Sequence, residues 1–142
     1  MTNNEAKLRD LIDGFVKSIR DKDIDGVMSV YASDLVAFDI VPPLQYESAE
    51  AFRIVWQGIF ELFEDAIQYE IRDLSITAGD DVAFSHSFNR LNGTMKNGIK
   101  SDLWVRWSAC FRKINGTWRI AHVQVSVPVD LASGKAVLHL KP

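Results

Sequence analysis

The sequence is poor in residues that mark several common kinds of protein. Its 142 residues contain one cysteine, Cys110, so no internal disulfide forms, which is typical of a reducing compartment. The 16 lysines and arginines are scattered, so a clustered phosphate-binding surface for nucleic acid is excluded. No apolar run approaches the ~18 residues of a membrane span, and the first ten residues lack the apolar stretch of a signal peptide. We therefore predict a cytoplasmic protein that binds neither nucleic acid nor a membrane.

Motifs of common cofactor and catalytic sites are also missing. The chain has no Gly-x-Gly-x-x-Gly fingerprint, no Walker loop and no Gly-x-Ser-x-Gly elbow. His86, His122 and His139 lack the spacing of zinc ligands. Cys110 lies in a strand-like run, where a buried thiol is expected. The sequence predicts a protein without a cofactor or metal.

The first half of the chain predicts three helices and one strand. Thr2 and Glu5 have the spacing of a capping box before a helix that reaches Arg20. Asp23 begins a short second helix with Tyr31 among its inward residues. Residues 35–40 form a strand ended by Pro42-Pro43, because proline has no N–H for a ladder. Ser48 begins a third helix with one apolar stripe, formed by Phe52, Val55, Trp56, Ile59, Phe60 and Phe63.

The second half predicts four strands. Ile67, Tyr69 and Ile71 alternate with polar residues, which is typical of a half-buried strand. Three long strands follow, over residues 81–95, 99–113 and 117–127. Asn97-Gly98 and Asn115-Gly116 join them, and Asn-Gly is the preferred hairpin turn. No linker or repeat interrupts the chain, so residues 1–142 are expected to form a single α+β domain.

The hairpins predict which residues share a face of the sheet. A two-residue turn at Asn97-Gly98 places His86 opposite Ala109 and Phe88 opposite Trp107, and the second hairpin places Trp107 opposite Val123. One face then holds Val82, Phe84, His86, Phe88, Val105, Trp107, Ala109, Phe111, Val123, Val125 and Val127, and is expected to pack against the helices. The other face holds Ser85, Ser87, Asn89, Trp104, Arg106, Ser108, His122, Gln124 and Ser126, and is expected to meet solvent or a second subunit. A bulge in any strand would exchange the faces beyond it.

The order of elements resembles a known superfamily. Tyr31-Ala-Ser-Asp34, followed by Asp39 and Pro42-Pro43, resembles ketosteroid isomerases and the SnoaL-like polyketide cyclases. The runs Trp104–Ser108, Phe111–His122 and Ser126–Pro128 look like SnoaL-like proteins. The resemblance covers nearly the whole chain. It implies a cone-shaped nuclear-transport-factor-2-like fold, with three helices on a curved, mostly antiparallel sheet around a small-molecule pocket. This fold hosts enzymes, binding modules and assembly domains alike, so it does not decide the activity.

The resemblance carries over to the site only in part. Asp39 falls where steroid isomerases have the carboxylate that moves a proton between carbons. Phe15 falls where they have a tyrosine that binds the substrate oxygen, and Trp107 falls near their protonated aspartic acid. Losing such donors typically lowers the rate by about 10²–10³-fold each, which argues against steroid isomerisation itself.

Asp39 and His86 are the candidate catalytic residues. A carboxylate between Phe38 and Ile40 loses hydration, which raises its pKa toward the range of a general base; a solvent-facing or turn-capping aspartate is the alternative. His86 could donate to a substrate carbonyl, or could be a satisfied core histidine. The candidate lining of an apolar ligand chamber consists of Phe15, Tyr46, Trp56, Phe60, Trp107 and Val125.

Two functional hypotheses follow. The first is a pocket protein that takes a proton next to a carbonyl of an apolar small molecule, giving isomerisation, cyclisation or dehydration. The second is a non-catalytic ligand-binding or assembly module of the same fold. A homodimer through the sheet face carrying Trp104, Arg106, His122 and Gln124 is expected, because Arg and Trp are enriched at interfaces. An anion-binding pocket formed by Asn89, Arg106, His122 and Gln124 is the other interpretation of this polar face.

Overall fold

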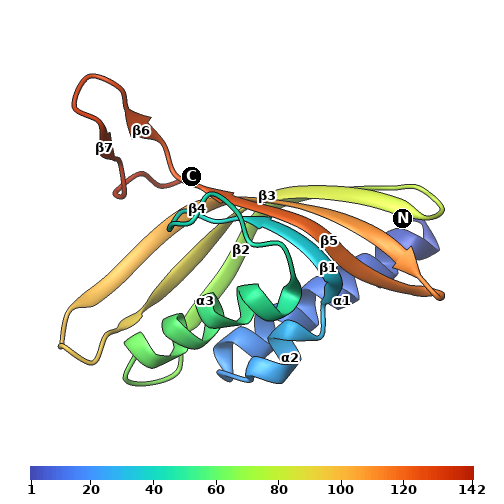
Figure 1. The fold of residues 1–142 in the computed structure, drawn as a ribbon, viewed down its shortest axis with the longest axis horizontal. Coiled ribbons are helices and arrows are strands. Elements are labelled where there is room, and N and C mark those ends of the chain that lie inside the picture. Colours follow the sequence, from blue (N-terminus) through green and yellow to red (C-terminus); the bar gives the residue numbers. More distant parts are fainter.

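The computed structural model, which describes all 142 residues, has helices on one side of a curved sheet (Figure 1). The helices are α1 (Asn3–Arg20), α2 (Ile24–Met28) and α3 (Ala49–Leu62). The strands are β1 (Tyr31–Phe38), β2 (Gln68–Ala78), β3 (Val82–Thr94), β4 (Lys100–Ile114), β5 (Thr117–Ser126), β6 (Val129–Asp130) and β7 (Lys135–Ala136). None of the helices has the length and apolar character needed to cross a membrane. The fold is the predicted α+β arrangement of three helices on one curved sheet.

Each helix begins at the side chain that the sequence indicated. Thr2, Asp23 and Ser48 occupy the three N-cap positions. Their side-chain oxygens accept hydrogen bonds from the backbone N–H groups three residues later, which would otherwise lack partners. α2 ends before Tyr31, however, and this residue begins β1 instead of closing the helix. The strand itself is earlier than predicted and stops at Phe38, so Asp39 follows it directly.

The main sheet has five strands in the order β1-β5-β4-β3-β2. β1 runs parallel to β5, and the other neighbours are antiparallel. The inner face of the sheet packs against α1 and α3 to form one apolar core, in which Leu8, Phe15, Phe111 and Ile120 are almost fully buried. The remaining two strands, β6 and β7, form a small hairpin that projects away from the body (Figure 1).

The β3–β4 hairpin differs from its predicted register by one residue. Thr94 pairs with Lys100, and the N–H of Met95 donates to the carbonyl of Ile99, so the loop has three residues instead of two. Gly98 has a φ of +82°, as expected for the left-handed residue that ends such a loop. Because side chains alternate between faces, this one residue turns every β3 side chain to the opposite face. Ser87, and not Phe88, lies opposite Trp107.

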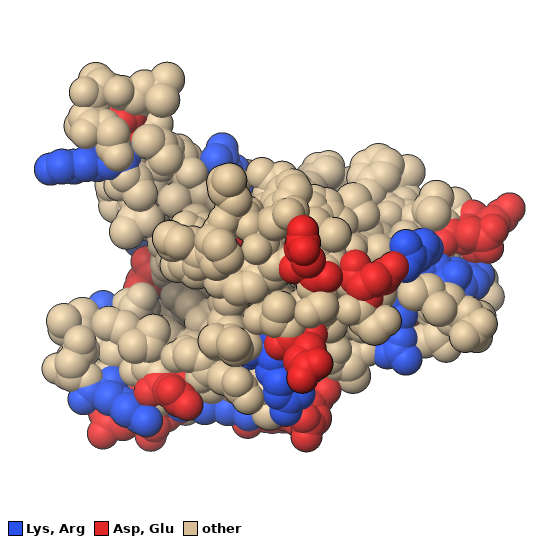
Figure 2. Space-filling model, in the orientation of Figure 1, with Lys and Arg blue, Asp and Glu red and all other residues tan.

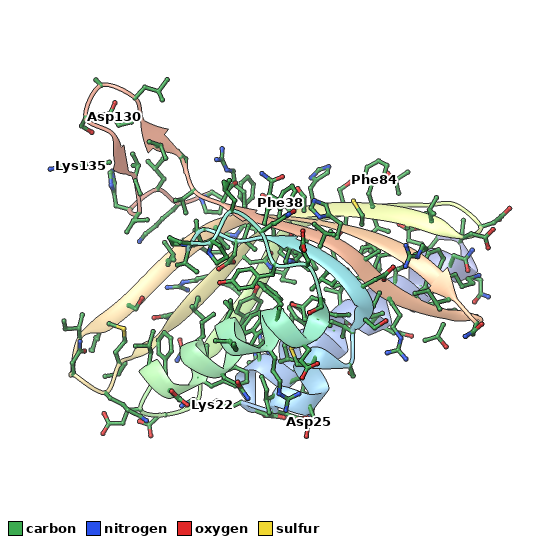
Figure 3. The ribbon with its side chains drawn as sticks, in the orientation of Figure 1. Lys22, Asp25, Phe38, Phe84, Asp130 and Lys135 are labelled. Atoms are coloured by element: carbon green, nitrogen blue, oxygen red, sulfur yellow. The ribbon has the colours of Figure 1, made fainter.

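The faces of β3 are therefore reversed from the prediction. Ala83, Ser85, Ser87 and Asn89 point inward and are buried, whereas Val82, Phe84, His86 and Phe88 point outward. Cys110 was expected to be buried, but it also faces outward and is exposed. Figure 3 shows Phe84 pointing away from the helices. The outer face of the sheet is consequently more apolar than the sequence suggested.

The pairing of β4 with β5 differs from the predicted register by two residues, which leaves the side chains on their predicted faces. Asn115 and Gly116 both have positive φ and form a two-residue turn, and a bulge near Ala121 then shifts the pairing by one. Trp107 lies opposite Val125, two residues from the predicted partner Val123. A shift of two residues preserves the face, so both valines lie on the predicted inner side.

Candidate functional site

An apolar pocket of about 550 Å³ lies between α3 and the inner face of the sheet. Its size is in the range of small-molecule sites. The nineteen lining residues are Tyr31, Asp39, Ile40, Val41, Tyr46, Phe52, Ile54, Val55, Trp56, Gly58, Ile59, Leu62, Tyr69, Leu91, Leu103, Val105, Trp107, Val123 and Val125. Asp39 is the only charged one. In Figure 2 a shaded hollow, bordered mainly by uncharged atoms, opens in the body below the base of the projecting arm.

Aromatic side chains form the deep wall of this pocket. Trp107 from β4 stacks on Phe15 with ring centroids 5.7 Å apart, and Trp56 from α3 meets the same ring edge-on at 5.7 Å. Trp107, Trp56, Tyr46 and Val125 line the cavity, as the sequence analysis proposed. Phe15 is buried behind the wall and does not line it. Phe60, also proposed as lining, instead packs beside Trp56 at 5.9 Å.

Asp39 lies at the edge of the pocket, in the segment that follows β1. Burial raises the pKa of its carboxyl, and backbone N–H groups of Val41 and Ile40 donate to it and oppose the rise. The same residue borders a second hollow of about 490 Å³ on the side of the β6–β7 arm, which Leu138 also lines. A carboxylate that is partly dehydrated and faces an apolar cavity has the properties of a general base.

The raised pKa of Asp39 implies a pH-dependent stability. The folded chain holds the Asp39 proton more tightly than the unfolded chain, so this group lowers the free energy of unfolding as the pH rises from about 3.8 through its raised pKa. Asp39→Asn is therefore expected to melt at a higher temperature than wild type at pH 7, with a gap that narrows toward pH 4. Thermal unfolding of both proteins at both pH values measures this gap. A lower melting temperature of Asp39→Asn at pH 7 would contradict the assigned burial.

Two tyrosine hydroxyls bring further polarity into the pocket wall. Trp56 Nε1 donates to Tyr31 Oη at 3.0 Å, and Asn89 Nδ2 donates to Tyr69 Oη at 2.7 Å. Ser87 Oγ donates to Asn89 Oδ1 at 2.6 Å and holds the amide in place. Of these residues, only Trp56 was predicted from the sequence to line the pocket. The available signal for Tyr69 was a phenol at an inward position between Ile67 and Ile71.

His86 lies outside the pocket. The changed register places it on the outer face of β3, exposed and on the far side of the sheet from Asp39. It therefore has no route to a substrate in the cavity, and the role of acid suggested for it is wrong. The outward cluster of Trp104, Arg106, His122 and Gln124 is on the predicted face, where Arg106 Nε donates to Ser126 Oγ and the His122 ring packs against Phe38.

The fold and pocket place the chain among the nuclear-transport-factor-2-like proteins with a cystatin-like fold. A profile of the SnoaL-like domain matches residues 8–130, and the chain belongs to this family. No curated protein matches it.

Solved structures agree with the family. An NTF2-like protein of unknown function from Pseudomonas putida KT2440 is 30% identical, with a TM-score of 0.87, covering 97% of this chain and 96% of that one. A ketosteroid isomerase-like protein from Erwinia carotovora atroseptica SCRI1043 is 21% identical, with a TM-score of 0.74 and coverage of 89% and 97%. An NTF2-like superfamily protein from Salmonella enterica serovar Typhimurium LT2 is 16% identical, with a TM-score of 0.78 and coverage of 94% and 96%. The latter two show the shared fold alone.

Proposed function

We propose that the protein binds an apolar carbonyl compound in its pocket and moves a proton next to the carbonyl, with Asp39 as the general base. The observation that carries this proposal is the position of Asp39, the one charged side chain on an otherwise apolar wall. Isolated carboxylates are unfavourable in such surroundings, so a role in chemistry gives a reason for its presence there. The ketosteroid isomerase-like relative with the same fold is consistent with this chemistry.

The proposed step balances without a further reactant. The Asp39 carboxylate takes the proton from the carbon beside the carbonyl, the C–H electron pair becomes the C=C bond of an enolate, and the C=O π electrons move to oxygen. Return of the proton to the same carbon gives exchange, and return to another carbon gives isomerisation. Loss of a neighbouring hydroxyl, which departs with a proton as water, gives dehydration. Asp39 serves all of these outcomes by holding one proton in the pocket.

Deuterium incorporation tests the proposed function. A ketone such as 2-acetylnaphthalene, incubated with the protein in D₂O, is expected to gain deuterium at the methyl group beside the carbonyl, as followed by ¹H NMR. If ketones bind but gain no deuterium above the rate in buffer, the non-catalytic ligand-binding interpretation replaces the enzymatic one.

We also propose that two copies associate through the outer face of the sheet. Phe38, Phe84 and Phe88 expose 38%, 52% and 37% of their surface there, which is unfavourable for an isolated chain. The β6–β7 arm projects away from the body (Figure 1), and it exposes apolar residues of its own, among them Leu131 and Leu138. A two-fold symmetric dimer would pack the outer faces of the two sheets against each other. Each β6–β7 arm could then pack its apolar residues on the partner.

Phe84→Asp is expected to convert a dimer to a monomer at micromolar concentration, because two carboxylates would be buried in the paired faces. Light scattering after size exclusion measures the mass, and Leu44→Asp, at a residue 95% exposed in the segment between β1 and α3, is the control. The outward thiol of Cys110 should also react more slowly with a thiol reagent in the dimer than in Phe84→Asp. A monomeric wild-type protein would contradict the proposed pairing.

A further inference from the structure

Two hydroxyl groups in the pocket wall have protons without an acceptor. Tyr31 and Tyr69 line the cavity and are only 6% and 7% exposed. Each accepts a hydrogen bond, from Trp56 and Asn89 respectively, but neither donates one to any protein atom. The third tyrosine of the lining differs, because Tyr46 Oη donates to the carbonyl of Pro42 at 3.1 Å. An unmade donor in a dry site is unfavourable, so these two protons are suited to an acceptor on a ligand.

The direction of both bonds follows from the partners. An indole N–H only donates, so Tyr31 Oη must be the acceptor of the bond from Trp56. Asn89 presents its Nδ2, which only donates, to Tyr69 Oη, while its Oδ1 accepts from the hydroxyl of Ser87. A phenol has one proton and two lone pairs, and in both tyrosines a lone pair is used while the proton remains free. The two anchoring bonds also restrict where each hydroxyl can lie.

Both phenols remain neutral donors. Burial raises the pKa of Tyr31 and of Tyr69 well above the ordinary value for tyrosine. For Tyr31, the hydrogen bond from Trp56 opposes the rise, and the charges of Tyr69 and Asp39 add to it. All three residues line the same cavity.

We propose that Tyr31 and Tyr69 together bind the carbonyl oxygen of the ligand and stabilise the negative charge that this oxygen gains when Asp39 takes a proton. The proposal rests on the proposed function and adds the ligand's orientation: oxygen toward the two phenols, the adjacent carbon toward Asp39. It also specifies the ligand class, an apolar ketone or similar carbonyl compound without a charged group. Donors aimed at a developing oxyanion are among the strongest contributions to such catalysis.

Phe15 supports this assignment. Its ring meets the rings of Tyr31 and Tyr69 edge-on, at 6.2 and 6.4 Å, so it contacts both tyrosines at once. Phe15 itself has no hydroxyl to offer a ligand. The free protons of its two neighbours supply the donors that Phe15 lacks.

A pair of matched probes tests the proposal. 2-Acetylnaphthalene has a carbonyl oxygen where 2-isopropenylnaphthalene has a CH₂ group, and quenching of the pocket tryptophans reports the binding of either. Wild type is expected to prefer the ketone by about tenfold, as two hydrogen bonds would provide. Tyr31→Phe and Tyr69→Phe should each reduce this preference several-fold and leave alkene binding unchanged. Thr117→Val removes an exposed hydroxyl from a residue outside the pocket lining, so it is the control and should change neither.

Infrared spectroscopy provides a reading that requires no substitution. With ¹³C in the carbonyl, the bound ketone should stretch at a lower frequency than in an apolar solvent, since hydrogen bonds weaken the C=O bond. Each tyrosine variant should return part of that shift. An unshifted carbonyl in wild type, or equal affinity for ketone and alkene, would overturn the proposal.

The outcome also separates this proposal from the role of Asp39. Asp39→Asn should keep the ketone preference and the low carbonyl frequency while losing proton exchange. If the tyrosine variants keep the full preference while wild type exchanges protons, the oxygen site is wrong and the base stands. If the preference depends on the tyrosines but wild type shows no exchange, the oxygen site stands and the base is wrong.

Discussion

Asp39→Asn is expected to slow proton exchange next to the carbonyl of a bound ketone by about 10²–10⁴-fold, the usual contribution of a positioned acid–base group. The amide has nearly the same shape as the carboxylate but does not accept the proton. Affinity for 2-acetylnaphthalene should therefore stay within about twofold of wild type. Single-turnover ¹H NMR in D₂O gives the exchange rate, and tryptophan quenching gives the affinity.

Asp34→Asn is the matched control for this change. Asp34 is a carboxylate on the preceding strand β1, but its side chain is exposed and pairs with Arg112 at 2.9 Å on the surface. Its replacement should leave exchange unchanged. Equal exchange rates in wild type and Asp39→Asn would show that Asp39 has only a structural role.

Trp107→Ala is expected to lower the free energy of unfolding by about 3–5 kcal/mol. The side chain is 3% exposed and stacks on Phe15, so its replacement by alanine removes an aromatic contact and enlarges the cavity. Urea denaturation monitored by circular dichroism measures the loss. The larger cavity should also admit a bulkier ketone than wild type accepts.

Trp104→Ala tests whether the stability loss in Trp107→Ala comes from the burial of that side chain and not from the loss of any tryptophan. Trp104 lies three residues earlier on β4 and faces outward, where Arg72 and Arg90 approach its ring at 4.9 and 5.8 Å. Such contacts contribute about 0.5–1 kcal/mol at exposed sites, so this variant should lose much less stability than Trp107→Ala. Comparable losses in the two variants would contradict the placement of Trp107 in the deep wall.

Most of the fold could be predicted because it depends on local signals. The caps at Thr2, Asp23 and Ser48 and the two Asn-Gly turns are determined by a few neighbouring residues, and all five lie where the sequence placed them. The register of β3 could not be predicted in this way. Asn97-Gly98 is compatible with loops of two or three residues, and the choice between them reverses every side chain of the strand.

The composition of β3 favoured the wrong one of those two registers. Phe84 and Phe88 favour an inward face by hydrophobicity, yet Ser85, Ser87 and Asn89 occupy it. Asn89 is fully buried because Tyr69 and Ser87 satisfy its amide, a tertiary arrangement with no local signature. The same arrangement hid Tyr69 as a candidate. Asp39 could be found because a charge among apolar neighbours at a strand end is visible in the sequence itself.

The most direct test of the central claim is the fate of the protons beside the carbonyl in wild-type protein. Incubation of 2-acetylnaphthalene with the protein in D₂O is expected to give deuterium at the methyl group and nowhere on the ring, at a rate that rises with pH as Asp39 loses its proton. The alkene 2-isopropenylnaphthalene should slow the reaction by occupying the same pocket. A ketone that binds with a lowered carbonyl frequency but exchanges no faster than in buffer would contradict catalysis by Asp39.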